Sequence, residues 1–247
     1  MTSSTTKDQI ESLLDVYQDL NRALDALTFE APVAHVYNPL KYAHRPARLY
    51  LEKYLAGPAE RTLLLGMNPG PWGMAQTGVP FGEIEAVRDW LEIKAPVEQP
   101  DNMHPKRPIE GFDCTRSEVS GRRLWGYFAD RFETATKFRN HFVIFNYCPL
   151  IFLEQSGRNR TPDKLTKDER EALYEICDRC LVAVLEILTI KKALGVGKFA
   201  EKCLKRVKNR VSTLQEVGSI LHPSPASPAA NRGWAEQVAP ILERCIP

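Results

Sequence analysis

The sequence carries little net charge and has no long hydrophobic run. Its 33 Lys and Arg residues are nearly balanced by 31 Asp and Glu residues, which gives a formal net charge of +2. No apolar stretch approaches the roughly 20 residues that a membrane span requires. The mostly polar N-terminus has no basic region followed by an apolar core, so it does not form a secretory signal. We therefore expect a soluble, intracellular protein without a membrane partner, in which any anion-binding surface is local.

The chain also lacks the cysteine pattern of a disulfide framework or a metal site. Its six cysteines are scattered, and only Cys177 and Cys180 have the spacing of a metal-ligating pair. No second pair or nearby histidine completes a zinc or iron–sulfur set. We predict that these two thiols are half-buried residues of one helix, and that the protein uses no metal and no cofactor.

Two glycine-containing segments fall short of the known phosphate-binding loops. The glycines of residues 66–73 do not have the G-x-G-x-x-G spacing, and the two prolines there remove backbone donors. Residues 195–198 do not form a P-loop, because Phe199 follows where Ser or Thr should bind magnesium. The first segment is better suited to a stiff platform that fixes the side chain of Asn68, although an ordinary Pro/Gly turn would look similar.

What the sequence does contain is an alternation of strand and helix patterns. Four short apolar runs lead into Gly or Pro, as buried parallel strands do; they span residues 62–67, 142–146, 192–196 and 217–222. Helical patterns cover residues 7–27, 48–55, 83–91, 117–131, 168–189, 199–209 and 228–244. These patterns predict an α/β fold, a three-layer α-β-α sandwich with a central four-stranded parallel sheet. We expect a single domain over residues 1–247, with residues 1–36 as an N-terminal helical extension of it.

Polar residues stand at the ends of three predicted strands, where ligands of such sheets bind. They are Asn68, Asn146 and His222. A lone histidine at a strand end is more often a hydrogen-bonded structural residue than a catalyst. Phe81 likewise fits either the core or a ring that stacks on a base. The proline-rich loop after His222 has the stiffness to enter a narrow space.

Basic residues cluster in four places. These are residues 104–107, 121–123, 158–160 and 198–210. Each cluster is compatible with phosphate contacts, but each also fits an ordinary solvated surface.

Five segments of the sequence together match a known family. They are residues 66–83, 146–150, 156–159, 195–197 and 222–225, joined by the linking segments 104–108 and 117–122. From about residue 37 to residue 234 the chain closely resembles the single-strand-selective monofunctional uracil-DNA glycosylases. The resemblance implies a hydrolase that flips uracil out of DNA, breaks its N-glycosidic bond and starts base excision repair of DNA damage. No lysine lies inside the motifs to form a Schiff base, so we expect no strand cleavage.

The resemblance also implies roles for single residues. Asn68 holds the attacking water, and His222 donates to the uracil O2 as negative charge develops. The substrate-binding residues are Met67, Gly70, Phe81 and Asn146. Phe81 stacks on the base, Asn146 reads its edge, and Gly70 leaves room beside C5 for 5-hydroxymethyluracil.

The loop after His222 is implied to contact DNA. Its expected contacts are Pro223, Ser224, Pro225, Ala226, Asn231 and Arg232. In animal members an arginine follows His-Pro-Ser-Pro, whereas this chain has Ala226, so we expect weaker or redistributed duplex wedging. The expected partners are single-stranded and double-stranded DNA containing uracil, with free uracil as product. We expect a monomer, in the cytoplasm if the source is bacterial and in the nucleus if it is eukaryotic.

Two other functions compete with this interpretation. The first is an inactive nucleic-acid-binding module on the same fold; the presence of Asn68, Phe81, Asn146 and His222 together argues against it. The second is a hydrolase of free nucleosides. So small a substrate would not require the basic clusters or the stiff loop.

Overall fold

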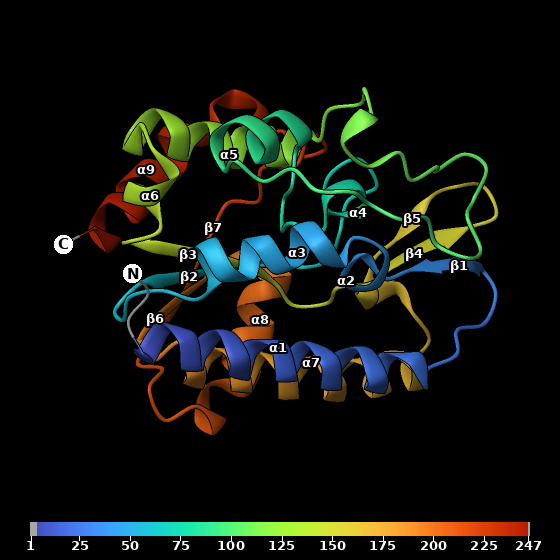
Figure 1. The fold of residues 1–247 in the computed structure, drawn as a ribbon, viewed down its shortest axis with the longest axis horizontal. Coiled ribbons are helices and arrows are strands. Elements are labelled where there is room, and N and C mark those ends of the chain that lie inside the picture. Colours follow the sequence, from blue (N-terminus) through green and yellow to red (C-terminus); the bar gives the residue numbers. More distant parts are fainter. Residues whose placement is uncertain (1–3, 247) are drawn as a thin grey trace.

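A parallel four-stranded sheet forms the centre of the molecule. The structure, a computed structural model, describes residues 4–246 (Figure 1). The strand order is β3 (Phe142–Asn146), β2 (Thr62–Gly66), β6 (Lys192–Val196) and β7 (Glu216–Ile220). The predicted fold class is confirmed, and each strand lies within two residues of its predicted bounds.

Apolar burial explains why these short runs form the sheet. Every residue of β2 and β3 is buried, and Leu64 lies between Ile144 and Leu194 of the neighbouring strands. A strand covered on both faces needs no polar alternation, since neither face meets water. The continuous apolar runs therefore mark strands that are covered on both faces, including β3 at the edge of the sheet.

Helices cover both faces of the sheet (Figure 1). On one side lie α5 (Val119–Phe132), α6 (Ala135–Phe138) and α9 (Trp234–Leu242); on the other lie α1 (Ser4–Asp25), α7 (Lys167–Ile187) and α8 (Lys198–Val207). The continuous pair α3 (His44–Tyr50) and η1 (Leu51–Leu55) packs against β3. Short helical segments complete the described chain: α2 (Pro39–Tyr42), α4 (Met74–Thr77), η2 (Ala86–Trp90), η3 (Gly111–Asp113), η4 (Pro162–Lys164), η5 (Lys208–Arg210), η6 (Ala230–Arg232) and η7 (Glu243–Cys245).

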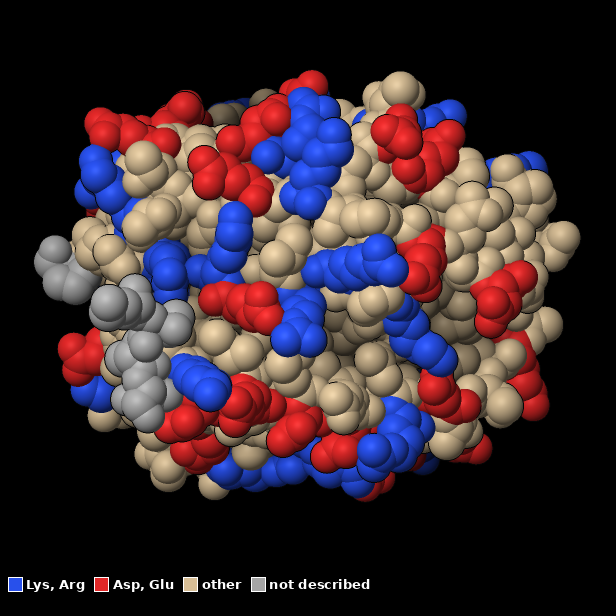
Figure 2. All heavy atoms as spheres, in the orientation of Figure 1, with Lys and Arg blue, Asp and Glu red and all other residues tan. Residues whose placement is uncertain are grey.

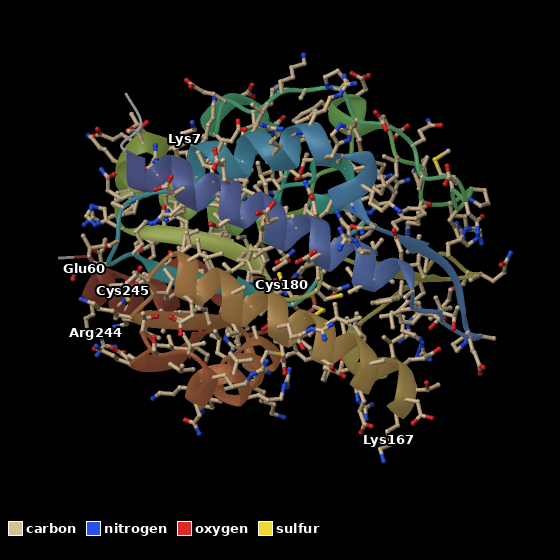
Figure 3. The ribbon with its side chains drawn as sticks, turned by 60° about the horizontal axis from the view of Figure 1, so that its bottom comes forward. Lys7, Glu60, Lys167, Cys180, Arg244 and Cys245 are labelled. Carbon is tan, nitrogen blue, oxygen red and sulfur yellow. The ribbon has the colours of Figure 1, made fainter. Side chains whose placement is uncertain are left out.

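The N-terminal helix α1 lies side by side with α7. Figure 3 shows Lys7 near the start of α1 and Lys167 at the start of α7, at opposite ends of the pair, so the two helices run antiparallel. Leu13 and Leu20 of α1 are buried in the core. On α7, Cys177 and Cys180 are fully buried, so the prediction of half-buried thiols was wrong; both belong to the apolar core.

A second, smaller sheet has no counterpart in the prediction. It is antiparallel, in the order β1 (Val33–Tyr37), β4 (Ile151–Glu154) and β5 (Asn159–Arg160). The last helix also differs, because it begins at Trp234 and not at residue 228. The residues before it form turns and η6.

No helix within residues 4–246 is long and apolar enough to cross a membrane. On the face drawn in Figure 2, basic and acidic side chains are interspersed. This mixture agrees with the small net charge of the sequence.

Candidate active site

A pocket of about 410 Å³ opens at the carboxyl ends of the central strands. Its lining includes eight residues that the sequence singled out: Met67, Asn68, Gly70, Phe81, Asn146, His222, Ser224 and Pro225. The carboxyl ends of parallel strands meet at one edge of a sheet, so loops far apart in sequence converge there. A larger, open depression of about 750 Å³ lies beside the end of α1, and none of the predicted residues lines it.

Asn146 closes β3 at the bottom of this pocket. Its side chain is buried, and its Nδ2 donates to the sulfur of Met74 at 3.1 Å. A Cβ atom at Gly66 would overlap Asn146 Oδ1 and would lie 2.7 Å from the ring of Phe81. The glycine at the end of β2 thus lets an amide and an aromatic ring approach the same small space.

Phe81 and His222 face each other across the pocket. Their ring centroids are 6.1 Å apart, with an angle of 44° between the planes. The backbone at Phe81 has φ of 53°, a conformation that few residues other than glycine adopt. Its carbonyl accepts a hydrogen bond from Trp125 Nε1 at 3.1 Å, which holds this turn against α5.

His222 follows β7 by two residues and is half-buried. Burial lowers the pKa of its imidazole, because the charged form loses hydration. The ring is therefore neutral at pH 7 and donates one N–H. Gly197, with φ of 92°, supports it from behind: a Cβ there would lie 3.2 Å from the Cβ of His222. The glycines of residues 195–197 thus serve tight packing, not phosphate binding.

Asn68 extends from the loop after β2. Its Nδ2 donates to the backbone carbonyl of Leu150 at 3.2 Å. With the nitrogen held in this way, Oδ1 is the part of the amide that is available to accept a hydrogen bond in the pocket. The loop itself is anchored by Asn159, whose Nδ2 donates to the carbonyl of Pro69 at 3.3 Å.

The space beside Gly70 is occupied by Glu118. A Cβ atom at residue 70 would overlap Oε2 of this carboxylate, so glycine is needed there for the close approach of Glu118. Burial raises the pKa of Glu118, an effect that the backbone N–H groups of Ser120 and Trp72 oppose. The open room that the sequence suggested beside Gly70 therefore has a carboxylate as its wall. Glu118 lies in the linking segment 117–122 of the family resemblance, but nothing in its spacing indicated a place in the pocket.

Gln76 joins two loops beneath the pocket rim. Its buried Nε2 donates to the carbonyls of Pro71 and Pro108, each at 3.0 Å. Its Oε1 accepts from the backbone N–H groups of Glu110 and Gly111, at 2.9 and 3.1 Å. One amide thus fixes residues 108–111 to the loop that carries Asn68.

Arg123 of α5 holds the loop after β7. Its guanidinium donates to the carbonyls of Pro223 and Ser224 at 3.2 and 3.3 Å, and to Asn231 Oδ1 at 2.8 Å. The sequence placed Arg123 in a basic cluster but did not connect it with this loop. Its role depends on two segments about 100 residues apart, and no local pattern reveals that.

The expected DNA-contacting residues of this loop differ in exposure. Pro225, Ala226, Asn231 and Arg232 are exposed, Ser224 is half-buried, and the side chain of Pro223 is buried. Asn231 is engaged within the loop, since its Nδ2 donates to the carbonyl of Pro225 at 2.9 Å. The exposed members form the surface available to a partner, whereas Pro223 belongs to the packing beneath it.

No lysine lines the pocket among the residues that the structure describes. The described chain also contains no group of three or more His, Cys, Asp or Glu side chains placed to hold a metal ion. The chemistry available in the pocket is therefore that of three amides, three hydroxyls, an imidazole, a carboxylate and an aromatic ring.

The fold and this pocket agree with a match to a family model. The model of the uracil DNA glycosylase superfamily matches residues 53–242, which is more than half of the chain. The matched range includes all the pocket residues named above. The chain is thus a member of that superfamily.

Individual relatives narrow the assignment. The single-strand selective monofunctional uracil DNA glycosylase of Mus musculus is 46% identical over 229 residues, which are 93% of this chain and 82% of the relative. The Rattus norvegicus protein of the same description is 47% identical over 224 residues, covering 91% and 80%. The crystal structure of SMUG2 from Pedobacter heparinus has a TM-score of 0.66 at 18% identity, over 93% of this chain and 96% of that one, and supports the fold alone. The chain belongs to the family of single-strand-selective monofunctional uracil-DNA glycosylases.

Proposed function

We propose that this protein hydrolyses the N-glycosidic bond of uracil in DNA and releases free uracil as the first step of base excision repair. The observation that carries the proposal is that Asn68, Phe81, Asn146 and His222 line one pocket. The pocket is recessed below the surface of the molecule, so the target nucleotide must leave the base stack to reach it. Its volume of about 410 Å³ is suited to a single base and part of its sugar.

Recognition of uracil rests on Phe81 and Asn146. The flipped base stacks on the ring of Phe81, and the amide of Asn146 accepts from N3–H and donates to O4. Cytosine presents the opposite polarity at both atoms and would leave buried polar groups unpaired. The burial of Asn146 makes this mismatch costly, since no water can take over the lost hydrogen bonds.

Bond cleavage rests on His222 and Asn68. As the bond breaks, negative charge develops on uracil O2, and the neutral imidazole N–H of His222 stabilises it. Asn68 Oδ1 orients a water toward the cation-like sugar. An amide is a poor base, so we expect slower turnover than in an enzyme that has a general base. Because none of the described residues that line the pocket carries an amine, we expect water alone to attack the sugar and the strand to stay intact.

The Glu118 side chain beside Gly70 affects which bases the pocket accepts. Glu118 offers a hydrogen-bond acceptor next to the glycine, and the O–H of a 5-hydroxymethyl group is a donor. We therefore propose 5-hydroxymethyluracil as a second substrate. The relatives are named for selectivity toward single strands; for this chain we propose that single-stranded and double-stranded DNA both react. A monomeric state remains part of the proposal.

An excision assay tests the proposed function. Oligonucleotides that contain one uracil, single-stranded or paired with guanine, are incubated with the protein and then treated with alkali, which cuts at abasic sites. We expect breaks only after alkali, and only in the uracil-containing strand. A matched oligonucleotide with cytosine at the same position is the control. Intact DNA after alkali would disprove the enzyme, and breaks before alkali would disprove simple hydrolysis.

A further inference from the structure

Two arginines share the ring of Trp72 at the rim of the pocket. The guanidinium carbon of Arg107 lies 5.1 Å from the ring centroid, and that of Arg116 lies 4.5 Å from it. Trp72 follows the pocket-lining Pro71, and its backbone N–H faces the pocket carboxylate of Glu118. These three residues, the Trp72 platform, are thus directly next to the site where the base is proposed to bind.

The two guanidinium groups have no acidic partner. Within residues 4–246, neither Arg107 nor Arg116 forms an ion pair, whereas Arg131 and Arg206 pair closely with Glu243 and Asp178. Two like charges on one ring repel each other, and their attraction to the ring offsets this only in part. A bound anion would offset the remaining repulsion between the two guanidinium groups. A guanidinium presents a planar fork of donors that fits phosphate oxygens.

Hydrogen bonds fix the position of Arg107, although it lies outside the long helices. Arg107 Nε donates to the carbonyl of Gly157 at 2.7 Å, and its own carbonyl accepts from Tyr37 Oη at 2.9 Å. Gln76 ties the residues after Arg107 to the carbonyl of Pro71, next to Trp72. A cationic group held in place before binding loses little conformational freedom when its partner arrives.

Two further basic residues extend this surface. Lys106 precedes Arg107 and packs against Gly157, where a Cβ would lie 3.2 Å from that of Lys106. Arg158 follows Gly157. Both side chains are exposed, and neither forms an ion pair with a described residue. The basic surface therefore extends away from the pocket. The sugar–phosphate backbone of a bound nucleic acid strand would run along it.

We propose that the Trp72 platform binds a backbone phosphate of the DNA strand beside the nucleotide that enters the pocket. This inference rests on the proposed function for its choice of DNA as the partner. The platform supplies cations on the Asn68 side of the pocket, whereas the loop after His222 carries only Arg232 as an exposed cation. Phosphate is present in single and double strands alike, so the contact serves both.

The experiment measures DNA binding without turnover. Arg116→Glu is compared with Arg210→Glu by titrating a uracil-free, fluorescently labelled oligonucleotide at several NaCl concentrations. Arg210 is the matched control, because it is exposed, has no ion pair within the described chain, and lies in η5, just before β7 and so at the opposite end of the sheet. Both substitutions change the net charge equally.

We expect Arg116→Glu to weaken binding about tenfold at moderate salt and to lower the salt slope by about 1. Arg210→Glu should do neither to a comparable degree. Single-turnover excision at subsaturating DNA should slow in Arg116→Glu in step with the weaker binding, because Arg116 does not line the pocket. Trp72→Phe should weaken binding less than Arg116→Glu does.

Equal affinities and equal salt slopes for the two glutamate variants would overturn the inference. A lower single-turnover rate at saturating DNA with unchanged affinity would also overturn it, since Arg116 would then act on the reaction. Failure of the proposed function looks different: uracil is not excised by the wild type, while the binding difference between the variants persists.

Discussion

The two loops that flank the pocket are built in different ways. The loop after β2 is held from below: Gln76 and Asn159 donate to its backbone carbonyls, and Pro69 is buried. The loop after β7 is more exposed than the loop after β2, and its hydrogen bonds come from its own residues, from Gln237 and from Arg123. The first loop is suited to fixing a water and a base, and the second to meeting a partner of variable shape. Each loop also bears one of the two proposed catalytic residues.

The sharpest test removes those two residues. Asn68→Ala and His222→Ala should each lower the single-turnover excision rate by about 10² to 10³, because one oriented donor or acceptor in the transition state is lost. DNA affinity should change little, since neither residue is part of the exposed surface. Rapid-quench kinetics and anisotropy titrations measure the two quantities. A variant with wild-type turnover would show that its residue has no such role.

A pair of glutamines tests how firmly each loop is held. Gln76→Leu leaves four buried or partly buried backbone groups without their partner, so the free energy of unfolding should fall by about 3 kcal/mol. Gln237→Leu removes two hydrogen bonds from the exposed loop and should cost less than about 1 kcal/mol. Urea unfolding compares the variants. Equal losses would mean that the two loops do not differ in this way.

Base reading takes place between the loops, at Asn146. In Asn146→Asp the carboxylate cannot donate to O4, so the ratio of uracil to cytosine excision should fall by about tenfold or more. Parallel assays on matched oligonucleotides measure that ratio, with thermal unfolding as the control for the buried substitution. An unchanged ratio would remove Asn146 from base recognition.

Substitution of Arg123 tests whether the loop after β7 must be held in place. In Arg123→Ala the loop loses three hydrogen bonds, and KM for uracil-containing DNA should rise about fivefold with kcat nearly unchanged. The neighbouring Arg122→Ala is the control, since Arg122 is exposed and its guanidinium donates, within the described chain, a single hydrogen bond, to Ser117 Oγ at 3.4 Å. If both variants raised KM equally, a general loss of charge and not the loop would be responsible.

The smallest effect concerns pH. Burial lowers the pKa of His222 below 6.5, so the unfolded chain binds a proton at a pH at which the folded chain does not. The free energy of unfolding should therefore fall as the pH drops below about 6.5 toward the lowered pKa. His222→Asn should show a smaller fall between about pH 7.5 and pH 5.5 in urea titrations. An identical fall in both proteins would contradict the role of burial.

The central sheet could be predicted because each of its strands is a continuous apolar run that ends at Gly or Pro. The small sheet could not: β1 alternates exposed and half-buried residues, contains His35, and pairs with a strand more than a hundred residues away. Its stability depends on that distant partner, and a local pattern does not show it. The same limit applies to the late start of α9, where Ser227 and Asn231 close turns of their own.

The residues of the candidate site also differ in whether the sequence could predict their place. Asn68, Asn146 and His222 were predicted to lie together because strand ends converge in any parallel sheet. The sequence did not predict the roles of Glu118, Gln76 and Arg123. Each of them contacts a segment that comes near only in the folded chain. The role of Gly70 beside uracil C5 stays a prediction, and the structure adds that Glu118 lies against this glycine.

The carboxylate of Glu118 beside Gly70 affects the width of the pocket. A pocket bounded by backbone has a fixed width, whereas a glutamate side chain can turn about three bonds. At Gly70 the diameter of the pocket is set by the rotamer of Glu118, while the loop that carries Asn68 stays in place. Turning this one side chain would widen the pocket beside Gly70, at the cost of the hydrogen bonds that Glu118 accepts from the backbone N–H groups of Ser120 and Trp72.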